Sequence, residues 1–187
     1  MLKNIKSAAK GTIIYGLANV SVKLIGVILI PIYTNEKYLS KNDFGVLGIM
    51  DITFQLAVIF FGLALYQSLA RWYYDPEHKS AQKSMHFTVV ITNAFVCGLS
   101  FLFVFGFSPK LSSLLFDTQQ YSRLIWIMFA SASVNIISSV SMMLLRLREE
   151  ATKYAVISVA KLLITLIVTI HFIVNLRKGV TGVYEAT

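Results

Sequence analysis

The sequence has 187 residues, of which 56% are apolar and 14% charged, with a net charge of +8. Soluble domains carry about 25% charged residues, so this composition excludes an ordinary water-soluble globule, and its mean hydropathy of +0.69 excludes a disordered chain. A nucleic-acid partner is also excluded, because the basic residues separate apolar runs instead of gathering on one face. An integral membrane protein remains.

Five apolar stretches are long enough to cross a bilayer, since a helix rises about 1.5 Å per residue and needs roughly 20 apolar residues. They cover about residues 12–33, 44–70, 86–107, 122–145 and 153–175. A membrane β-barrel does not fit, because its strands are segments of about ten residues with alternating polarity. The sequence therefore predicts an all-α polytopic membrane helix bundle with five full transmembrane helices.

Three other segments refine this prediction. The three lysines near the N-terminus resemble the start of a signal peptide, but bulky residues continue to Pro31 without a small-residue cleavage site, which favours a retained span. The segment 108–117 is too short to cross and is predicted to lie along the outer interface. Residues from about 179 onward are expected to be the start of a sixth span that is cut off.

The orientation follows from lysines and arginines in the short loops. With the N-terminus in the cytoplasm, the inner side holds nine of them and the outer side six. The nine are Lys3, Lys6, Lys10, Arg71, Lys79, Lys83, Arg146, Arg148 and Lys153. We therefore predict a multi-pass protein of the cell (inner) membrane with a cytoplasmic N-terminus.

Each span carries polar residues three or four positions apart, so that they share one helical face. In chain order these stripes are Tyr15, Asn19, Lys23 and Gly26; Gly48, Asp51, Gln55, Gly62 and Tyr66; Asn93, Cys97 and Ser100; Ser131, Asn135 and Ser138; Ser158, Lys161, Thr165 and Thr169. Lipid cannot satisfy polar groups, so the stripes are expected to face other helices or water. In the third and fourth spans, hydrogen bonds between helices are the favoured explanation.

The charged residues need a stronger explanation. Lys23 lies near the middle of its span, where a lysine costs roughly 2.5 to 3.5 kcal/mol. We expect it to border a water-filled cavity with an anionic guest, rather than to reach the headgroups. Lys161 is closer to the cytoplasmic side and is compatible with either position.

Two further charged residues each have two interpretations. Asp51, about 10 Å inside the second span, is predicted to pair with Lys23, and the alternative is a carboxylate that binds a coupling proton or cation. Arg71 closes the second span beside interfacial aromatic residues and is expected to anchor the topology, with a gate contact for phosphate as the alternative. The candidate cavity-lining residues are Tyr15, Asn19, Lys23, Asp51, Gln55 and Lys161.

Motifs for catalysis are missing from the sequence. No His, Asp or Glu cluster has metal-ligand spacing, no serine lies in G-x-S-x-G, and no glycine-rich phosphate loop occurs. We therefore predict neither an enzyme nor a bound metal or cofactor.

Five short motifs, in this order and spacing, resemble one family. They are IIYGLANVSVKLIGVILIPIYT, LSKNDFGVLGIM, SLARWYYD, FSPKLSSLLFD and LLRLREEATKYAVISV. Over residues 11–182 the chain resembles the N-terminal part of bacterial polysaccharide biosynthesis transporters, the O-antigen type oligosaccharide flippases. These belong to one superfamily with multidrug extrusion proteins and the lipid II flippase.

The resemblance implies two six-helix lobes around a central cavity that opens alternately to the two leaflets. Residues 1–187 would be most of the first lobe, and Lys23 matches a lysine often found in the family's first helix. The implied cargo is an oligosaccharide repeat unit on a polyprenyl diphosphate, with a proton or sodium ion as the coupling ion. Lys161 departs from the apolar or small residue expected in the fifth helix.

The missing second lobe implies either a fragment or a partner that supplies the rest, and we expect a fragment that does not transport alone. An organic-cation antiporter of the same superfamily is one alternative, although a cationic Lys23 in the cavity argues against cationic cargo. The other alternative is a membrane scaffold subunit without cargo, whose polar stripes only hold helices together.

Overall fold

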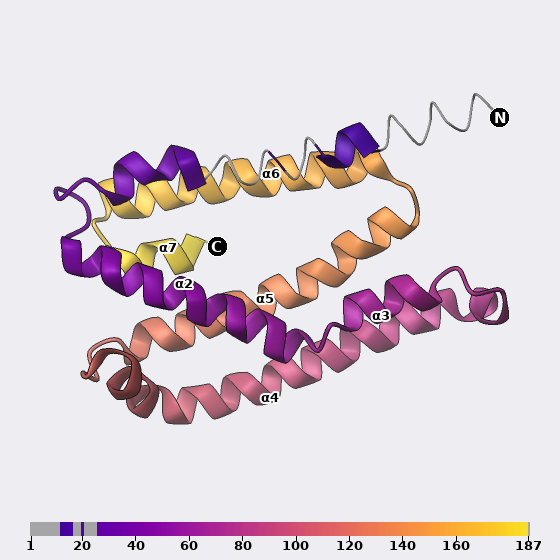
Figure 1. Ribbon diagram of the computed structural model, residues 1–187, viewed down its shortest axis with the longest axis horizontal. Coiled ribbons are helices and arrows are strands. Elements are labelled where there is room, and N and C mark those ends of the chain that lie inside the picture. Colours follow the sequence, from indigo (N-terminus) through magenta and orange to yellow (C-terminus); the bar gives the residue numbers. More distant parts are fainter. Residues whose placement is uncertain (1–11, 17–19, 21–25, 187) are drawn as a thin grey trace.

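The computed structural model describes residues 12–16, 20 and 26–186, and all regular structure in this part is helical. The long helices alternate in direction along the chain (Figure 1). The long helices are α2 (Lys41–Gly62), α4 (Gln82–Phe116), α5 (Ser122–Leu147) and α6 (Ala151–Ile170). Shorter helices are α3 (Leu65–Trp72), η1 (Pro76–Ala81), η2 (His171–Asn175) and α7 (Val180–Ala186). The prediction of an all-helical bundle is confirmed.

Four helical segments of the described part are long and apolar enough to cross a membrane. They are Lys41–Gly62, Lys79–Phe116, Ser122–Leu147 and Ala151–Asn175, and they coincide with most of the second to fifth predicted spans. The first predicted span, 12–33, is described only in part: residues 12–16 and 26–33 are helical, and most of those between lie outside the described residues.

The second predicted span, 44–70, is not one continuous helix. Helix α2 ends at Gly62, and α3 begins at Leu65. Between them, Leu63 and Ala64 adopt the left-handed conformation, with φ of 48° and 50°. Side chains with a Cβ rarely adopt this conformation, which costs roughly 1 to 2 kcal/mol per residue.

The third predicted span is longer than expected, because the segment 108–117 does not form a separate interfacial element. Helix α4 continues through Pro109 to Phe116, over 35 residues or about 50 Å. Proline has no N–H to bond the carbonyl oxygen of Phe105, and the Ser108 hydroxyl donates to that oxygen instead, at 3.2 Å. The replaced hydrogen bond explains why the helix does not end at the proline.

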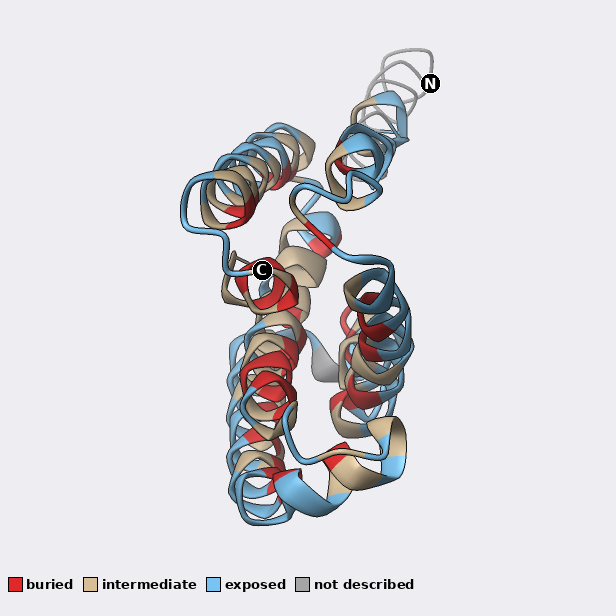
Figure 2. Cartoon of the chain, turned by 90° about the vertical axis from the view of Figure 1, so that its left-hand side faces the viewer, coloured by how far each residue is buried: buried red, intermediate tan, exposed pale blue. Residues whose placement is uncertain are grey.

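Within the described residues, most buried apolar side chains fall into two clusters. The larger cluster joins α2, α5, η2 and α7 and includes Met50, Ile125, Met128 and Ile173, all fully buried. The smaller cluster consists of Leu69, Tyr73, Val140 and Leu147. Figure 2 shows that buried residues lie mainly where helices face one another, whereas large parts of the outer surfaces are exposed. The break between α2 and α3 separates the helix that packs in the larger cluster from the helix that packs in the smaller one.

Candidate functional site

A single tyrosine of α7 connects three helices through polar contacts. The hydroxyl of Tyr184 donates to Asp51 Oδ1 of α2 at 2.5 Å, and its main-chain oxygen accepts from the Ser131 hydroxyl of α5 at 2.6 Å. Its ring packs against Phe54 of α2, with the centroids 6.3 Å apart. Tyr184 is 3% exposed, so the tyrosine itself is buried in the bundle.

The chain turns sharply before α7, and this turn brings Tyr184 to Asp51. Gly179 has a φ of +59°, a conformation that glycine adopts without strain. Gly182 lies close against η2, because a Cβ added there would be 2.9 Å from the Phe172 Cβ. These two glycines let α7 return into the bundle between α6 and α2 (Figure 1).

Asp51 and Gln55 lie one turn apart on α2, and both are exposed although they lie within a candidate membrane span. Met50, next to Asp51, is fully buried, so the two polar residues lie at the edge of the packed face. An ionised carboxylate can accept about four hydrogen bonds. Tyr184 supplies one, which leaves Asp51 able to accept further donors or a cation.

The predicted ion pair between Asp51 and Lys23 stays a prediction, because Lys23 and Asn19 lie outside the described residues. The polar partner that the structure gives to Asp51 is Tyr184, which is not among the residues predicted from the sequence. Its only local signal is a polar ring within the small and apolar segment GVTGVYEAT.

Tyr15 lies near the beginning of α6, because its ring contacts Tyr154 there, and η2 follows the other end of that helix. Its ring contacts Tyr154 edge to face at 5.1 Å, and the Tyr154 hydroxyl accepts a hydrogen bond from the Arg146 guanidinium. Among the described residues the buried Tyr15 hydroxyl has no hydrogen-bond partner. Tyr15 and Asp51 therefore belong to different ends of the bundle.

Two further residues predicted from the sequence, Lys161 and Arg71, are exposed. On α6, Ser158 and Thr169 of the polar stripe are buried, whereas Lys161 is exposed. Arg71 is exposed at the end of α3, with its guanidinium 5.6 Å from the ring centroid of Trp72. Of the candidate cavity-lining residues that the structure describes, Asp51 and Gln55 lie near each other, because they are one turn apart on α2.

The polar stripes of the third and fourth spans lie between helices in part as expected. Asn93, Cys97 and Ser100 are all buried on α4. The Ser100 hydroxyl donates to the Cys97 oxygen of its own helix, whereas Ser131 bonds across to α7. The expected hydrogen bond between helices is therefore confirmed for Ser131 but not for Ser100.

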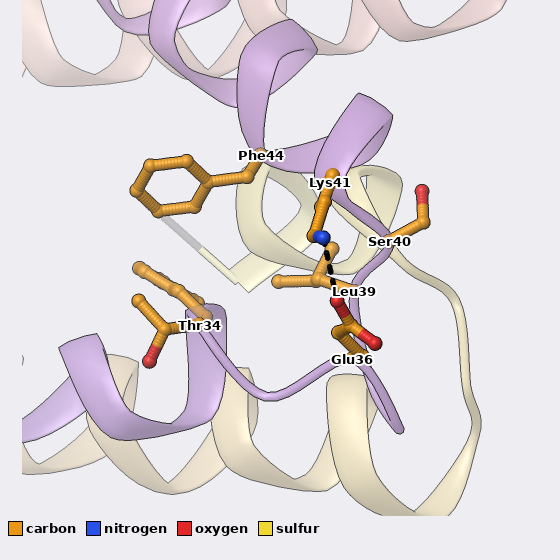
Figure 3. Close-up of a pocket in the computed structure, with 7 residues that line it drawn as sticks. Thr34, Glu36, Leu39, Ser40, Lys41 and Phe44 are labelled. Carbon is orange, nitrogen blue, oxygen red and sulfur yellow. Dashed lines mark ion pairs between the residues drawn. The ribbon is translucent and has the colours of Figure 1, made fainter.

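A small cavity lies in the loop that leads into α2 (Figure 3). Its volume is about 230 Å³, and it is lined by Tyr33, Thr34, Glu36, Leu39, Ser40, Lys41 and Phe44. The Lys41 and Glu36 side chains form an exposed ion pair at 3.3 Å, and exposed pairs contribute little stability. Ser40 caps α2 together with Asp43. These contacts lie in the loop where α2 begins.

Comparisons with protein-family models, with curated proteins and with solved structures found no match to this chain. Within the described part, no group of three or more His, Cys, Asp or Glu residues is placed to hold a metal ion. The functional interpretation therefore depends on the polar residues of the candidate spans.

Proposed function

We propose that the chain forms the N-terminal lobe of a membrane flippase that moves polyprenyl-diphosphate-linked oligosaccharide across the cytoplasmic membrane by alternating access. One structural observation supports transport most strongly. Asp51, Gln55 and Lys161 lie within candidate membrane spans, yet all three are exposed on the surface of the chain. The order of the sequence motifs supports this class of cargo.

Exposure to hydrocarbon would be costly for these residues, since a charged side chain at the bilayer centre costs roughly 2.5 to 3.5 kcal/mol. A water-filled cavity or a second lobe avoids this cost. On α2, Asp51 contacts Tyr184 of α7, and Gln55 lies one turn further along. The exposed surface continues with apolar residues such as Ile52 and Leu56, which are 62% and 61% exposed. Helix α2 thus carries a polar edge suited to a cavity and an apolar face suited to lipid.

In the proposed mechanism, cationic residues of the cavity bind the anionic cargo. A diphosphate that leaves water needs positive charge nearby, and Lys23 provides it in this proposal. Asp51 then serves either as the counter-charge of Lys23 or as the group that binds the coupling proton or sodium ion. In both cases the hydrogen bond from Tyr184 orients the carboxylate.

Cysteine labelling tests whether the polar residues of the candidate spans are accessible to water. In a Cys97→Ser background, Gln55→Cys and Lys161→Cys are compared with Leu56→Cys and Ile164→Cys, which are 61% and 62% exposed apolar positions on the same helices. A hydrophilic maleimide is expected to label the two polar positions in membranes and to leave the two apolar positions unlabelled.

The same experiment separates transport from the alternative of a scaffold without cargo. A scaffold would bury its polar residues against partner helices, so Gln55→Cys and Lys161→Cys would stay unlabelled. Asn19→Cys and Lys23→Cys extend the test to the first span. Lack of labelling at all four polar positions would contradict the proposed cavity.

A further inference from the structure

The break between α2 and α3 is not dictated by the local sequence. Alanine and leucine are among the strongest helix formers, and the segment 60–69 contains one glycine and no proline. One continuous helix over α2 and α3 is therefore the conformation that these residues favour on their own. Instead, Leu63 and Ala64 both adopt left-handed backbone angles. Leu63 is 53% exposed and Ala64 is also exposed, so their own side chains do not hold the break.

Packing on the two sides of the break holds it in place. Helix α2 packs in the larger cluster through Met50, whereas α3 packs in the smaller cluster through Leu69, together with Val140 of α5. Helix α5 is continuous and contributes to both clusters, so it positions α2 and α3 separately. Figure 1 shows α3 beside α4, set off from the end of α2. We call this position of α3 the docked position.

The contacts that hold α3 in the docked position are few. In a bilayer, apolar side chains gain little by exchanging lipid for another helix, so Leu69 contributes mainly through packing. Two hydrogen bonds add to it: the Tyr74 hydroxyl donates to the Leu147 oxygen of α5, and the Gln82 side chain donates to the Tyr73 oxygen, at 2.8 Å. Contacts of this kind are of the same order as the penalty for two left-handed residues that carry a Cβ. The docked and the straight arrangement are therefore close in free energy.

The connection after α3 is long enough for a movement. Nine residues, 73–81, join α3 to α4, and six of them form the short helix η1. Nine extended residues reach about 30 Å, which is more than the diameter of one helix, about 10 Å. Helix α3 can therefore leave the docked position while α4 and α5 stay in place.

We propose that Leu63 and Ala64 form a hinge, about which α3 swings from the docked position toward the axis of α2. The two residues then adopt right-handed helical angles, which removes the left-handed penalty and opens the smaller cluster. In the orientation predicted from the sequence, this opening lies at the cytoplasmic end of the bundle. The movement does not depend on the cargo of the proposed function.

Two spin labels measure the position of α3 in the full chain in lipid vesicles. In a Cys97→Ser background, the labels are attached at Ser68→Cys on α3 and Ser141→Cys on α5, which are both exposed positions. Double electron–electron resonance is expected to give two distances, a shorter one for the docked position and a longer one. A control pair at Thr88→Cys on α4 and Ser141→Cys joins two continuous helices and is expected to give one distance.

Two substitutions shift this equilibrium in opposite directions. Ala64→Gly removes the left-handed penalty and keeps the docked contacts, so it is expected to lower the ratio of the longer to the shorter distance at least about fivefold. Tyr74→Phe removes the hydrogen bond to Leu147 and is expected to raise this ratio about two- to tenfold. Ala70→Gly, in the regular part of α3, is the matched control and is expected not to lower the ratio.

Three results would overturn the hinge. A single distance in both the wild type and Tyr74→Phe would mean that α3 is fixed. A longer distance whose share is unchanged by Ala64→Gly would place the movement elsewhere than at the break. A second distance in the control pair would assign the movement to the whole bundle. None of these results concerns cargo, so the proposed function is tested separately.

Discussion

Replacing Tyr184 by phenylalanine removes one hydroxyl and tests the contact between α7 and α2. The aromatic ring against Phe54 and the main-chain oxygen that accepts from Ser131 both remain. The lost hydrogen bond, 2.5 Å long and accepted by the Asp51 carboxylate, belongs to a class worth about 1.5 to 3 kcal/mol in proteins. Polar contacts between membrane helices average only about 0.6 kcal/mol, with a maximum near 1.7. We therefore expect Tyr184→Phe to lower the free energy of unfolding by about 1 to 2 kcal/mol.

A double-mutant cycle shows whether this loss belongs to the contact with Asp51. In an Asp51→Ala background the Tyr184 hydroxyl becomes an unpartnered group in a side chain that is 3% exposed. Removing that hydroxyl should then be neutral or stabilising. Unfolding by denaturant in detergent measures all four chains. If Tyr184→Phe lowered the free energy of unfolding equally in the two backgrounds, the reasoning would be refuted. Tyr38→Phe is the control for loss of a hydroxyl, because Tyr38 is a half-buried tyrosine packed against the same cluster.

Two further substitutions test the backbone. Ala64→Gly should raise the free energy of unfolding by up to about 1 kcal/mol, because glycine adopts a φ of 50° without the penalty of a Cβ, and an unchanged or lower stability would argue against the left-handed break. Gly182→Ala should lower it by about 1 to 3 kcal/mol through the contact with Phe172, whereas Gly98→Ala, with open space around it, should not. Both are measured by thermal unfolding in detergent, and equal effects of the two alanines would count against the packing of α7 on η2.

The helical architecture could be predicted because it depends on the length of the apolar stretches. Apolar stretches of about 20 residues must be helical in a membrane, since no water is present to satisfy their backbone groups. The four candidate spans of the described part follow from this rule. The same rule locates the polar residues Asp51 and Lys161 within spans, but it says nothing about which helices they face.

Local deviations from the helical pattern could not be predicted. Leu63 and Ala64 are ordinary residues of an apolar run, and nothing in their identity indicates the left-handed conformation. Pro109 favours an interruption, yet the neighbouring Ser108 hydroxyl replaces the missing hydrogen bond and the helix continues. Both outcomes depend on contacts that a count of apolar residues does not include.

The contact between Tyr184 and Asp51 could not be predicted for a different reason. These residues lie 133 positions apart, so periodicity within one helix cannot relate them. The sequence places Asp51 within a membrane span, where an ionised side chain is energetically costly and needs a partner. Only the packing of α7 against α2 shows that one partner is a tyrosine hydroxyl.

Transport itself is tested most directly by measuring cargo in cells that produce this chain together with the second lobe that the proposal requires. The amount of polyprenyl-diphosphate-linked oligosaccharide that reaches the outer leaflet is compared for the wild type, Lys23→Ala and Lys23→Arg at equal protein levels. We expect export to be lost with alanine and largely retained with arginine, because arginine keeps the positive charge that the diphosphate needs. Unchanged export with Lys23→Ala would contradict the proposed role of the lysine and of an anionic cargo.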